Sequence, residues 1–231
     1  MPKNHSEKVK NHFTQEWEEY DSKISKAIPF YKESFDTLIS ILHGAGLNPK
    51  CILEIGVGTG NLTNRLLQEF PQTSLVGIDL VEDYIIQAKQ KLSVFEDRIK
   101  LSVKDVVDFD FIENYDLVIT SYVFHHIENN TKSSIYKKIY THLNPDGMFV
   151  NADFVDSSSS YFSNLFDQLR MEYMRSRGFN EDSIKSHYTE HRKLETPMPI
   201  EEQITLLSQI GFKDVECFWK YLNLAVFGGI K

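Results

Sequence analysis

Cys51-Ile-Leu-Glu-Ile-Gly-Val-Gly-Thr-Gly60 is the stretch that decides the fold of this 231-residue chain. Ile52, Leu53 and Ile55 form a short apolar run, typical of a strand buried on both faces of a parallel sheet. Three glycines follow at alternate positions, where the chain must turn sharply into a helix beginning near Asn61. Bare main chain and helix-terminal N–H groups at such a turn favour a nucleotide ligand.

The second part of the signal is Ser74-Leu-Val-Gly-Ile-Asp79, an apolar strand that ends in a carboxylate. It follows the glycines by about 20 residues, where dinucleotide-binding folds place the acid that binds ribose hydroxyls. The dinucleotide fingerprint G-x-G-x-x-G would require glycine at position 61, and this chain has Asn61. A nicotinamide dinucleotide is therefore disfavoured as the ligand.

The pattern Glu54-x-Gly56-x-Gly58-x-Gly60 resembles the first motif of the class I methyltransferases that use S-adenosyl-L-methionine (SAM). The resemblance implies SAM as cofactor and S-adenosyl-L-homocysteine (SAH) as product. In that family an acid after the third strand faces the adenine amino group, and the backbone of the next residue meets a ring nitrogen.

An aromatic residue from an N-terminal cap often meets the methionine end of SAM in the same family. The candidates for cofactor binding are Tyr20, Tyr31, Glu54, Gly56, Val57, Gly58, Gly60, Asn61, Asp79, Leu80, Asp105, Val106 and Ser121.

Composition limits the partners of this chain. It has 33 acidic and 25 basic residues and a net charge of −8, which argues against binding to nucleic acid or to an anionic membrane. Cys51 and Cys217 lack metal-type spacing, and we expect no metal site. Neither a signal peptide nor a run of about 18 apolar residues is present. We expect a soluble, cytoplasmic protein with a small-molecule substrate.

Five apolar strands alternating with helices predict a doubly wound parallel sheet. The expected strands are 51–55, 74–79, 99–103, 115–120 and 148–153, followed by an antiparallel pair at 214–220 and 222–227. This α/β, Rossmann-like arrangement is the class I methyltransferase fold, a seven-stranded mostly parallel sheet with an antiparallel last strand and helices on both faces. We predict one domain, 1–231, with a helical cap (1–48), a SAM-binding core (49–153), a helical lid insertion (154–198) and a C-terminal segment (199–231).

Two helices are expected in the cap. The first covers residues 6–19, where Val9, Phe13 and Trp17 form one apolar stripe. Pro29 is expected in the first turn of the second helix, which runs to about His43. The cap could close over a cofactor.

The candidates for catalysis follow strands four and five. Ser121-Tyr-Val-Phe-His-His-Ile127 carries Tyr122, His125 and His126, and either imidazole could act as a base near neutral pH. The alternative is that one histidine only packs against the sheet edge. Asp153 ends strand five at the same edge.

The insertion 154–198 is expected to be a lid or a homodimerisation arm. Arg192 is the candidate anchor for an acidic group of the substrate, and Tyr161 is a second candidate for substrate contact. His187 and His191 lie four residues apart and could share a helix face, although a solvated face is favoured over a metal site.

A narrower resemblance gives an alternative function. Ala27-Ile-Pro-Phe-Tyr31 and the tail from Gln209 to Lys231 resemble segments of the carboxy-SAM synthases, which convert SAM itself. This chain departs from that family at Phe30, Ser121 and His125, where Gly, Asn and Gln are expected. The leading hypothesis is therefore in-line methyl transfer to a small molecule. Conversion of SAM itself, by carboxy transfer or cyclisation, and noncatalytic SAM binding stay open as alternatives.

Overall fold

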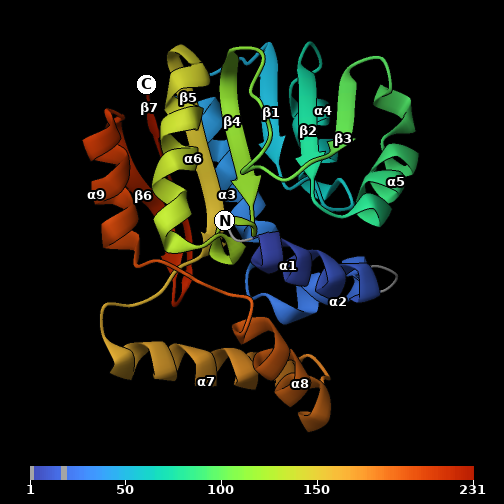
Figure 1. Cartoon of the computed structure of the whole chain (residues 1–231), viewed down its shortest axis with the longest axis vertical. Coiled ribbons are helices and arrows are strands. Elements are labelled where there is room, and N and C mark those ends of the chain that lie inside the picture. Colours follow the sequence, from blue (N-terminus) through green and yellow to red (C-terminus); the bar gives the residue numbers. More distant parts are fainter. Residues whose placement is uncertain (1–2, 17–19) are drawn as a thin grey trace.

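A seven-stranded sheet with the order β3-β2-β1-β4-β5-β7-β6 forms the centre of the molecule (Figure 1). The computed structural model describes residues 3–16 and 20–231. Strands β1 to β5 are parallel, and β7 runs antiparallel to both β5 and β6. The strands are β1 (Cys51–Ile55), β2 (Ser74–Asp79), β3 (Ile99–Val103), β4 (Tyr115–Ser121), β5 (Leu143–Phe154), β6 (Lys213–Tyr221) and β7 (Leu224–Ile230). The predicted fold class is confirmed.

Helices cover both faces of the sheet, and alternate residues of each strand supply the two cores. Leu53 packs on the face covered by α6 (Asn129–His142) and α9 (Ile200–Ile210). Ile52 packs on the opposite face, under α3 (Tyr31–Gly44) and α4 (Asn61–Glu69). Both faces of β1 are therefore buried, which explains its unbroken apolar run.

Further helices lie at the carboxyl-end edge of the parallel strands. In Figure 1, α1 (Lys3–Glu16) and α2 (Tyr20–Ala27) lie across this lower edge, with α7 (Ser160–Ser176) and α8 (Glu181–Arg192) below them. The helix α5 (Glu82–Lys91) follows β2, and a short 3-10 helix, η3 (Phe124–His126), follows β4. This edge of the sheet is therefore covered by the N-terminal helices and by the segment between β5 and α9.

The cap differs from the prediction of two helices, because three helices precede β1. Pro29 does not lie in a helix. It precedes Phe30, whose φ of 55° reverses the chain before α3 begins at Tyr31. The additional helix is α2, whose Ala27 packs against Met174 and Ile184 of the lid. Eight polar-rich residues are a marginal helix in isolation, so this element depends on its tertiary contacts.

Strand β5 begins earlier than expected, at Leu143. Leu143 pairs with Tyr115 and Met148 pairs with Leu117, so residues 144–147 form an irregularity inside the strand and not a separate turn. Strand β7 ends at Ile230, beyond the predicted limit, because it pairs with β5 along its whole length. In the part of the chain that the structure describes, no helix combines the length and apolar character needed to span a membrane.

Candidate functional site

The glycine loop after β1 has the backbone that its sequence predicts. Gly56, Gly58 and Gly60 all have positive φ, at 78°, 54° and 85°. A Cβ on Gly56 would lie 2.0 Å from Cγ2 of Val123, so a side chain at this position would collide with the segment after β4. The loop therefore needs glycine both for its turn and, at Gly56, for its close approach to the segment after β4.

Asp79 ties this loop to the end of β2. Its carboxylate accepts hydrogen bonds from Gly58 N at 2.8 Å and Val81 N at 2.9 Å. Desolvation raises the pKa of Asp79 to about 6, against the opposing effect of these backbone N–H groups. Each carboxylate oxygen retains acceptor capacity for a ligand hydroxyl.

A cleft of about 120 Å³ lies beside Asp79. Its lining combines the glycine loop, the ends of β2, β3 and β4, and helix α1. The lining residues are Ser6, Val9, Phe13, Ile55, Gly56, Gly58, Ile78, Asp79, Leu80, Val81, Tyr84, Lys104, Asp105, Val106, Ser121, Tyr122, Val123, His126 and Ile127. The sequence candidates Leu80, Asp105, Val106 and Ser121 thus share one cleft with Gly56, Gly58 and Asp79.

Glu54 lies behind the same loop and is fully buried. Thr63 Oγ1 donates a hydrogen bond to its Oε2 at 2.6 Å, and burial raises the pKa of Glu54 to about 8. Among the described residues, its Oε1 has no hydrogen-bond partner. A buried acceptor of this kind fits a site made for a cationic or hydrogen-bonding group of a ligand.

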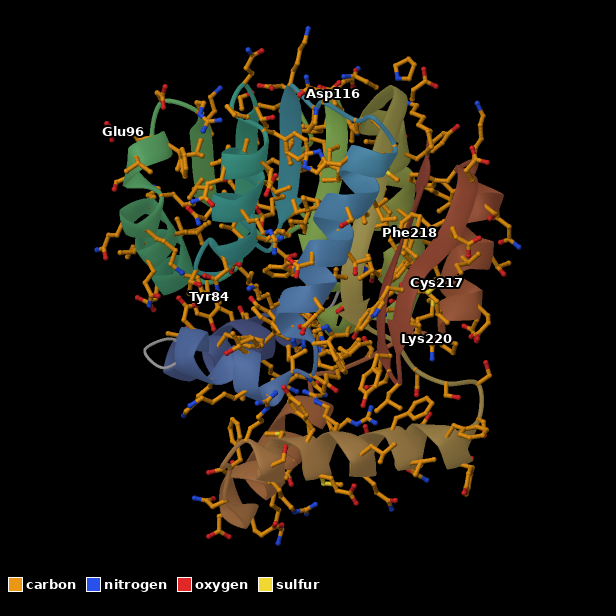
Figure 2. All side chains as sticks on the ribbon, turned by 180° about the vertical axis from the view of Figure 1, so that it is seen from behind. Tyr84, Glu96, Asp116, Cys217, Phe218 and Lys220 are labelled. Atoms are coloured by element: carbon orange, nitrogen blue, oxygen red, sulfur yellow. The ribbon has the colours of Figure 1, made fainter. Side chains whose placement is uncertain are left out.

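Helix α1 closes the cleft. Phe13 lies edge-on to His126, with ring centroids 5.1 Å apart, and also contacts Tyr84. The His5 ring donates from Nε2 to the carbonyl oxygen of His126 at 2.9 Å. Figure 2 shows Tyr84 at the edge of the sheet that faces the cap helices, with Asp116 at the opposite edge.

Helix α2 is tied to the glycine loop by a polar cluster. Asp21 accepts hydrogen bonds from Thr59 Oγ1 at 2.6 Å, Asn61 Nδ2 at 3.0 Å and Lys91 Nζ at 2.7 Å. The pKa of Asp21 is lowered, because these bonds outweigh the raising effect of its partial burial. The candidate Asn61 therefore joins the loop to the cap.

The ends of β4 and β5 bring His125 and Asp153 together in a buried pair. His125 Nδ1 lies 2.5 Å from Oδ1 of Asp153, and the side chains are 5% and 2% exposed. The Asp153 carboxylate also accepts the backbone N–H groups of His125 and Phe154, both at 2.9 Å. When the Asp153 carboxylate is ionised it only accepts, so Nδ1 donates to it, and in the neutral form of the ring the lone pair then lies on Nε2.

Two residues that the sequence did not indicate hold this pair in place. Thr196, near the end of the lid segment, donates its backbone N–H to the carbonyl oxygen of His125 at 2.6 Å. The buried Lys132 donates from Nζ to the Thr196 carbonyl at 2.5 Å. Burial raises the pKa of Asp153, and the ammonium of Lys132 opposes this effect. The end of the lid is thus attached directly to the histidine segment.

A second, larger cavity of about 700 Å³ lies between this pair and the lid. It shares Phe13, Tyr122 and His126 with the cleft. The rest of the lining comes from α2, η3, β5, α7 and α8 and from the loops that follow α2, α7 and α8. These lining residues are Lys23, Ile24, Lys26, Ala27, Ile28, His125, Phe154, Arg170, Arg177, Gly178, Phe179, Asn180, Asp182, Ser183, Ser186 and Glu195. A cavity of this size can hold a small organic molecule.

Tyr122 and Tyr31 form the wall between the cavities and the sheet. Tyr122 has a φ of 57°, and its hydroxyl lies 2.9 Å from Oγ of Ser34. Its ring stacks on Tyr31 with centroids 5.5 Å apart. Tyr122 lines both cavities, whereas Tyr31 packs behind it on Phe35.

Other sequence candidates lie outside both cavities. Val57 packs beneath the loop on Ile85, and Gly60 caps the N-terminus of α4. Arg192 forms an ion pair with Asp167 inside the lid, and Tyr161 is 70% exposed on α7. The side chains of Trp17, Tyr20, His187 and His191 lie outside the described residues.

Arg170 is a cavity residue that the sequence predictions missed, although its position in the sequence carries a signal. Arg170 lies four residues after Phe166 and four before Met174, inside the apolar stripe of its helix. A cation in an apolar stripe indicates a buried charge with a specific surrounding. The described residues contain no group of three or more His, Cys, Asp or Glu side chains arranged to hold a metal ion.

Comparisons with known proteins agree with this arrangement. A family model described as a methyltransferase domain matches residues 53–149. The chain is 24% identical to a carboxy-S-adenosyl-L-methionine synthase of Nautilia profundicola, over 92% of this chain and 90% of that protein.

Solved structures show the same fold. The magnesium protoporphyrin IX methyltransferase of Synechocystis PCC 6803, solved with bound SAH, has a TM-score of 0.68 at 14% sequence identity. The superposition covers 98% of this chain and 99% of that enzyme. Human N-acetylserotonin methyltransferase, in complex with SAM, has a TM-score of 0.58 at 18% identity over 86% of this chain. The present chain spans 51% of the human enzyme, about half its length.

Proposed function

Because this chain belongs to the class I SAM-dependent methyltransferases, we propose that it transfers a methyl group from SAM to a hydroxyl group of a small molecule. One observation carries the proposal: His125, which is paired with the buried Asp153, lines a cavity that adjoins the glycine-loop cleft. A general base beside an acceptor-sized cavity is what transfer to a protonated oxygen requires.

The cleft residues fit SAM. Asp79 would accept the ribose hydroxyls, Asp105 and Val106 would hold the adenine, and the bare glycine loop would accommodate the amino-acid end. The buried Oε1 of Glu54 is available as an acceptor behind this loop. When bound, SAM supplies an electrophilic methyl group on a sulfonium, whose leaving group is already activated.

The protein then has two tasks, to position the acceptor and to remove its proton. His125 Nε2 would accept the hydroxyl proton. Asp153 holds the ring by Nδ1 and would stabilise the imidazolium that forms. Because Thr196 donates its backbone N–H to the His125 carbonyl, the end of the lid segment helps to hold the base in position.

Calorimetric titration with SAM, SAH and NAD tests the cofactor first. We expect SAM and SAH to bind and NAD not to bind. Ligand at about 100 times its dissociation constant adds roughly 2.7 kcal/mol to the free energy of unfolding, so a thermal shift of several degrees should accompany binding. Binding of NAD alone, or of none of the three, would contradict the proposal.

Formation of SAH in the presence of hydroxylated acceptors tests the reaction. We expect SAH to accumulate only when an acceptor is added, with one methylated product for each SAH. SAM that is consumed without an acceptor would exclude this mechanism.

A second candidate function is conversion of SAM itself, as in the carboxy-SAM synthases. It is favoured by the similarity to the Nautilia protein along nearly the whole chain. When a carboxylic acid that can give up its carboxyl group is present, this function predicts a SAM derivative in which a carboxyl group replaces one hydrogen, and no methylated acceptor. Mass spectrometry of the nucleoside products distinguishes the two functions in one incubation.

A further inference from the structure

We propose that Lys132 is a positioning residue for the base: its buried ammonium holds the end of the lid segment on residues 124–127 and keeps the Asp153 carboxylate ionised. The inference rests on the role proposed above for His125 and adds the group that sets the pH range in which this base is available. It follows from an unfavourable place for a cation, from a chain of hydrogen bonds and from the charges around Asp153.

Lys132 occupies a place that disfavours lysine. It is only 1% exposed, on the face of α6 that carries Ile135, Tyr136 and Ile139 into the core. It also lies in the first turn of this helix, where the unpaired backbone N–H groups repel a cation. A cation that is buried and at the positive end of a helix requires specific partners.

The partners of Lys132 connect the lid segment to the base. Its Nζ donates to Oδ1 of Asn129 at 2.6 Å and to the carbonyl oxygen of Thr196 at 2.5 Å. Thr196 donates its backbone N–H to the His125 carbonyl at 2.6 Å, and its Oγ1 to the Ile127 carbonyl at 2.6 Å. One buried ammonium therefore anchors the residue that holds the backbone of the histidine segment at two points.

Lys132 also acts on Asp153 through its charge. Burial has the largest effect on Asp153 and raises its pKa, and the Lys132 ammonium opposes this effect more strongly than the His126 imidazole does. Burial lowers the pKa of Lys132 in turn, and the Asp153 carboxylate opposes that effect. Each of the two charges therefore stabilises the other.

The groups around Asp153 come from α6, from η3, from the segment after β4 and from α7. The titratable and charged side chains that act on Asp153 or lie beside it are Lys132, Tyr136, His125, His126, Tyr122 and Arg170. Removal of the ammonium should raise the proton affinity of the pair formed by Asp153 and His125, because one positive charge no longer opposes protonation. The base would then be protonated at higher pH.

The experiment measures the protonation of His125 directly and needs no acceptor. Histidine ring signals of the isotope-labelled, ligand-free protein are followed by NMR from about pH 5 to about pH 9, and His125→Gln identifies the His125 signals. Lys132→Met and Lys132→Gln should each move the midpoint of His125 protonation upward by about one pH unit. Lys132→Arg, which keeps the charge, should restore most of this shift.

Lys138→Met is the matched control. Lys138 lies on the same helix and also donates to a backbone carbonyl oxygen, that of Phe109, with its ammonium over the Phe111 ring. This variant should leave the His125 midpoint unchanged. A shift as large as that of Lys132→Met would overturn the assignment to Lys132.

Amide hydrogen exchange at Thr196 tests the attachment of the lid segment. Its N–H, which donates to the His125 carbonyl, should exchange about tenfold or more faster in Lys132→Met than in the unaltered protein. Lys132→Gln should show a smaller increase, because its side-chain amide can still donate to the Thr196 carbonyl.

Titration with SAH separates this inference from the proposed function. Lys132 is not among the described residues that line the cleft, so every variant should bind SAH as the unaltered protein does. A His125 midpoint that is the same in Lys132→Met, or an unchanged exchange rate at Thr196, would overturn the inference; if Lys132→Met does not fold, the midpoint of Lys132→Gln decides. Failure of the unaltered protein to bind SAH would instead overturn the proposed function.

Discussion

The cleft beside Asp79 and the cavity under the lid adjoin each other but are built in different ways. The cleft takes most of its lining from the short segments that follow β1, β2, β3 and β4, and it relies on backbone N–H groups and glycines. The cavity is assembled from α2, η3, β5 and the lid, and its chemistry resides in side chains such as His125 and Arg170. The first arrangement suits a constant cofactor, and the second allows the acceptor to vary.

The sharpest way to separate the two regions is His125→Gln. Loss of the general base should lower kcat by about 10²–10⁴-fold, while the dissociation constant of SAM stays unchanged. Single-turnover SAH formation and SAM titration measure the two effects. His142→Gln serves as a control, because the hydrogen bond described for the His142 ring goes to the Lys138 carbonyl oxygen within its own helix. Full activity of His125→Gln would remove the base from the mechanism.

The converse change is Asp79→Ala. The loss of charge-assisted bonds to the ribose should weaken SAM binding by about 3 kcal/mol. Asp116→Ala is the matched control, since Asp116 also accepts two backbone N–H groups, from Lys50 and Cys51, but at the opposite edge of the sheet (Figure 2).

Asp116→Ala should lower stability, because its carboxylate holds two backbone N–H groups, but only Asp79→Ala should lose affinity for SAM. Calorimetry gives the affinities and chemical unfolding gives the stabilities. Equal SAM affinity of the two variants would mean that the ribose lies elsewhere.

A smaller effect is expected from pH. The pKa of Asp79 is raised by desolvation to about 6, from an ordinary value of 3.8. Because the ionised carboxylate accepts the ribose hydroxyls, SAM affinity should fall below about pH 6, by up to tenfold per pH unit. Asp79→Asn should bind SAM weakly at every pH, and a pH dependence that persists in this variant would point to another group.

In the ligand-free protein, the contribution of Asp79 to stability changes with pH in the opposite direction to SAM affinity. The folded state binds protons more tightly at Asp79 than the unfolded state does, so the stability from this group is present below 3.8 and is lost as the pH rises through about 6. As the pH rises from 3.8 to about 6, thermal unfolding of the ligand-free protein should therefore show a falling contribution from Asp79. Over the same pH range, the stabilisation that added SAM provides should increase.

The smallest effect is expected from Asp21→Asn, which weakens the contact between cap and glycine loop. Because Asp21 is exposed and its partner Lys91 lies near the surface, the change should cost at most about 1 kcal/mol in SAM affinity. High salt should produce a similar decrease in the unaltered protein. Asp36→Asn, which breaks an ion pair with Arg65 between α3 and α4, is the control and should leave SAM affinity unchanged. A loss above tenfold would show that the cap, and not the cleft, dominates cofactor binding.

The main departures from the sequence predictions lie in elements whose stability depends on distant partners. Helix α2 was missed, since its eight residues are held by Ala27 against Met174 and Ile184. The start of β5 was placed too late, because pairing between Leu143 and Tyr115 continues the strand past a turn-like Asn-Pro-Asp-Gly run. Local propensity does not contain these contacts.

Local pattern alone determined the glycine loop, the acid that ends β2 and the parallel core of the sheet. Glycine at a positive φ and a strand buried on both faces are requirements of the backbone, and they appear directly in the order of residues. Only the tertiary structure decided that Arg170, and not Arg192, is among the described residues that line the cavity. Both arginines lie in the lid segment, but Asp167 pairs with Arg192, while the packing of α7 on Phe154 places Arg170 on the cavity wall. The partner of a side chain depends on the packing of elements far apart in the sequence, and no spacing along the chain encodes it.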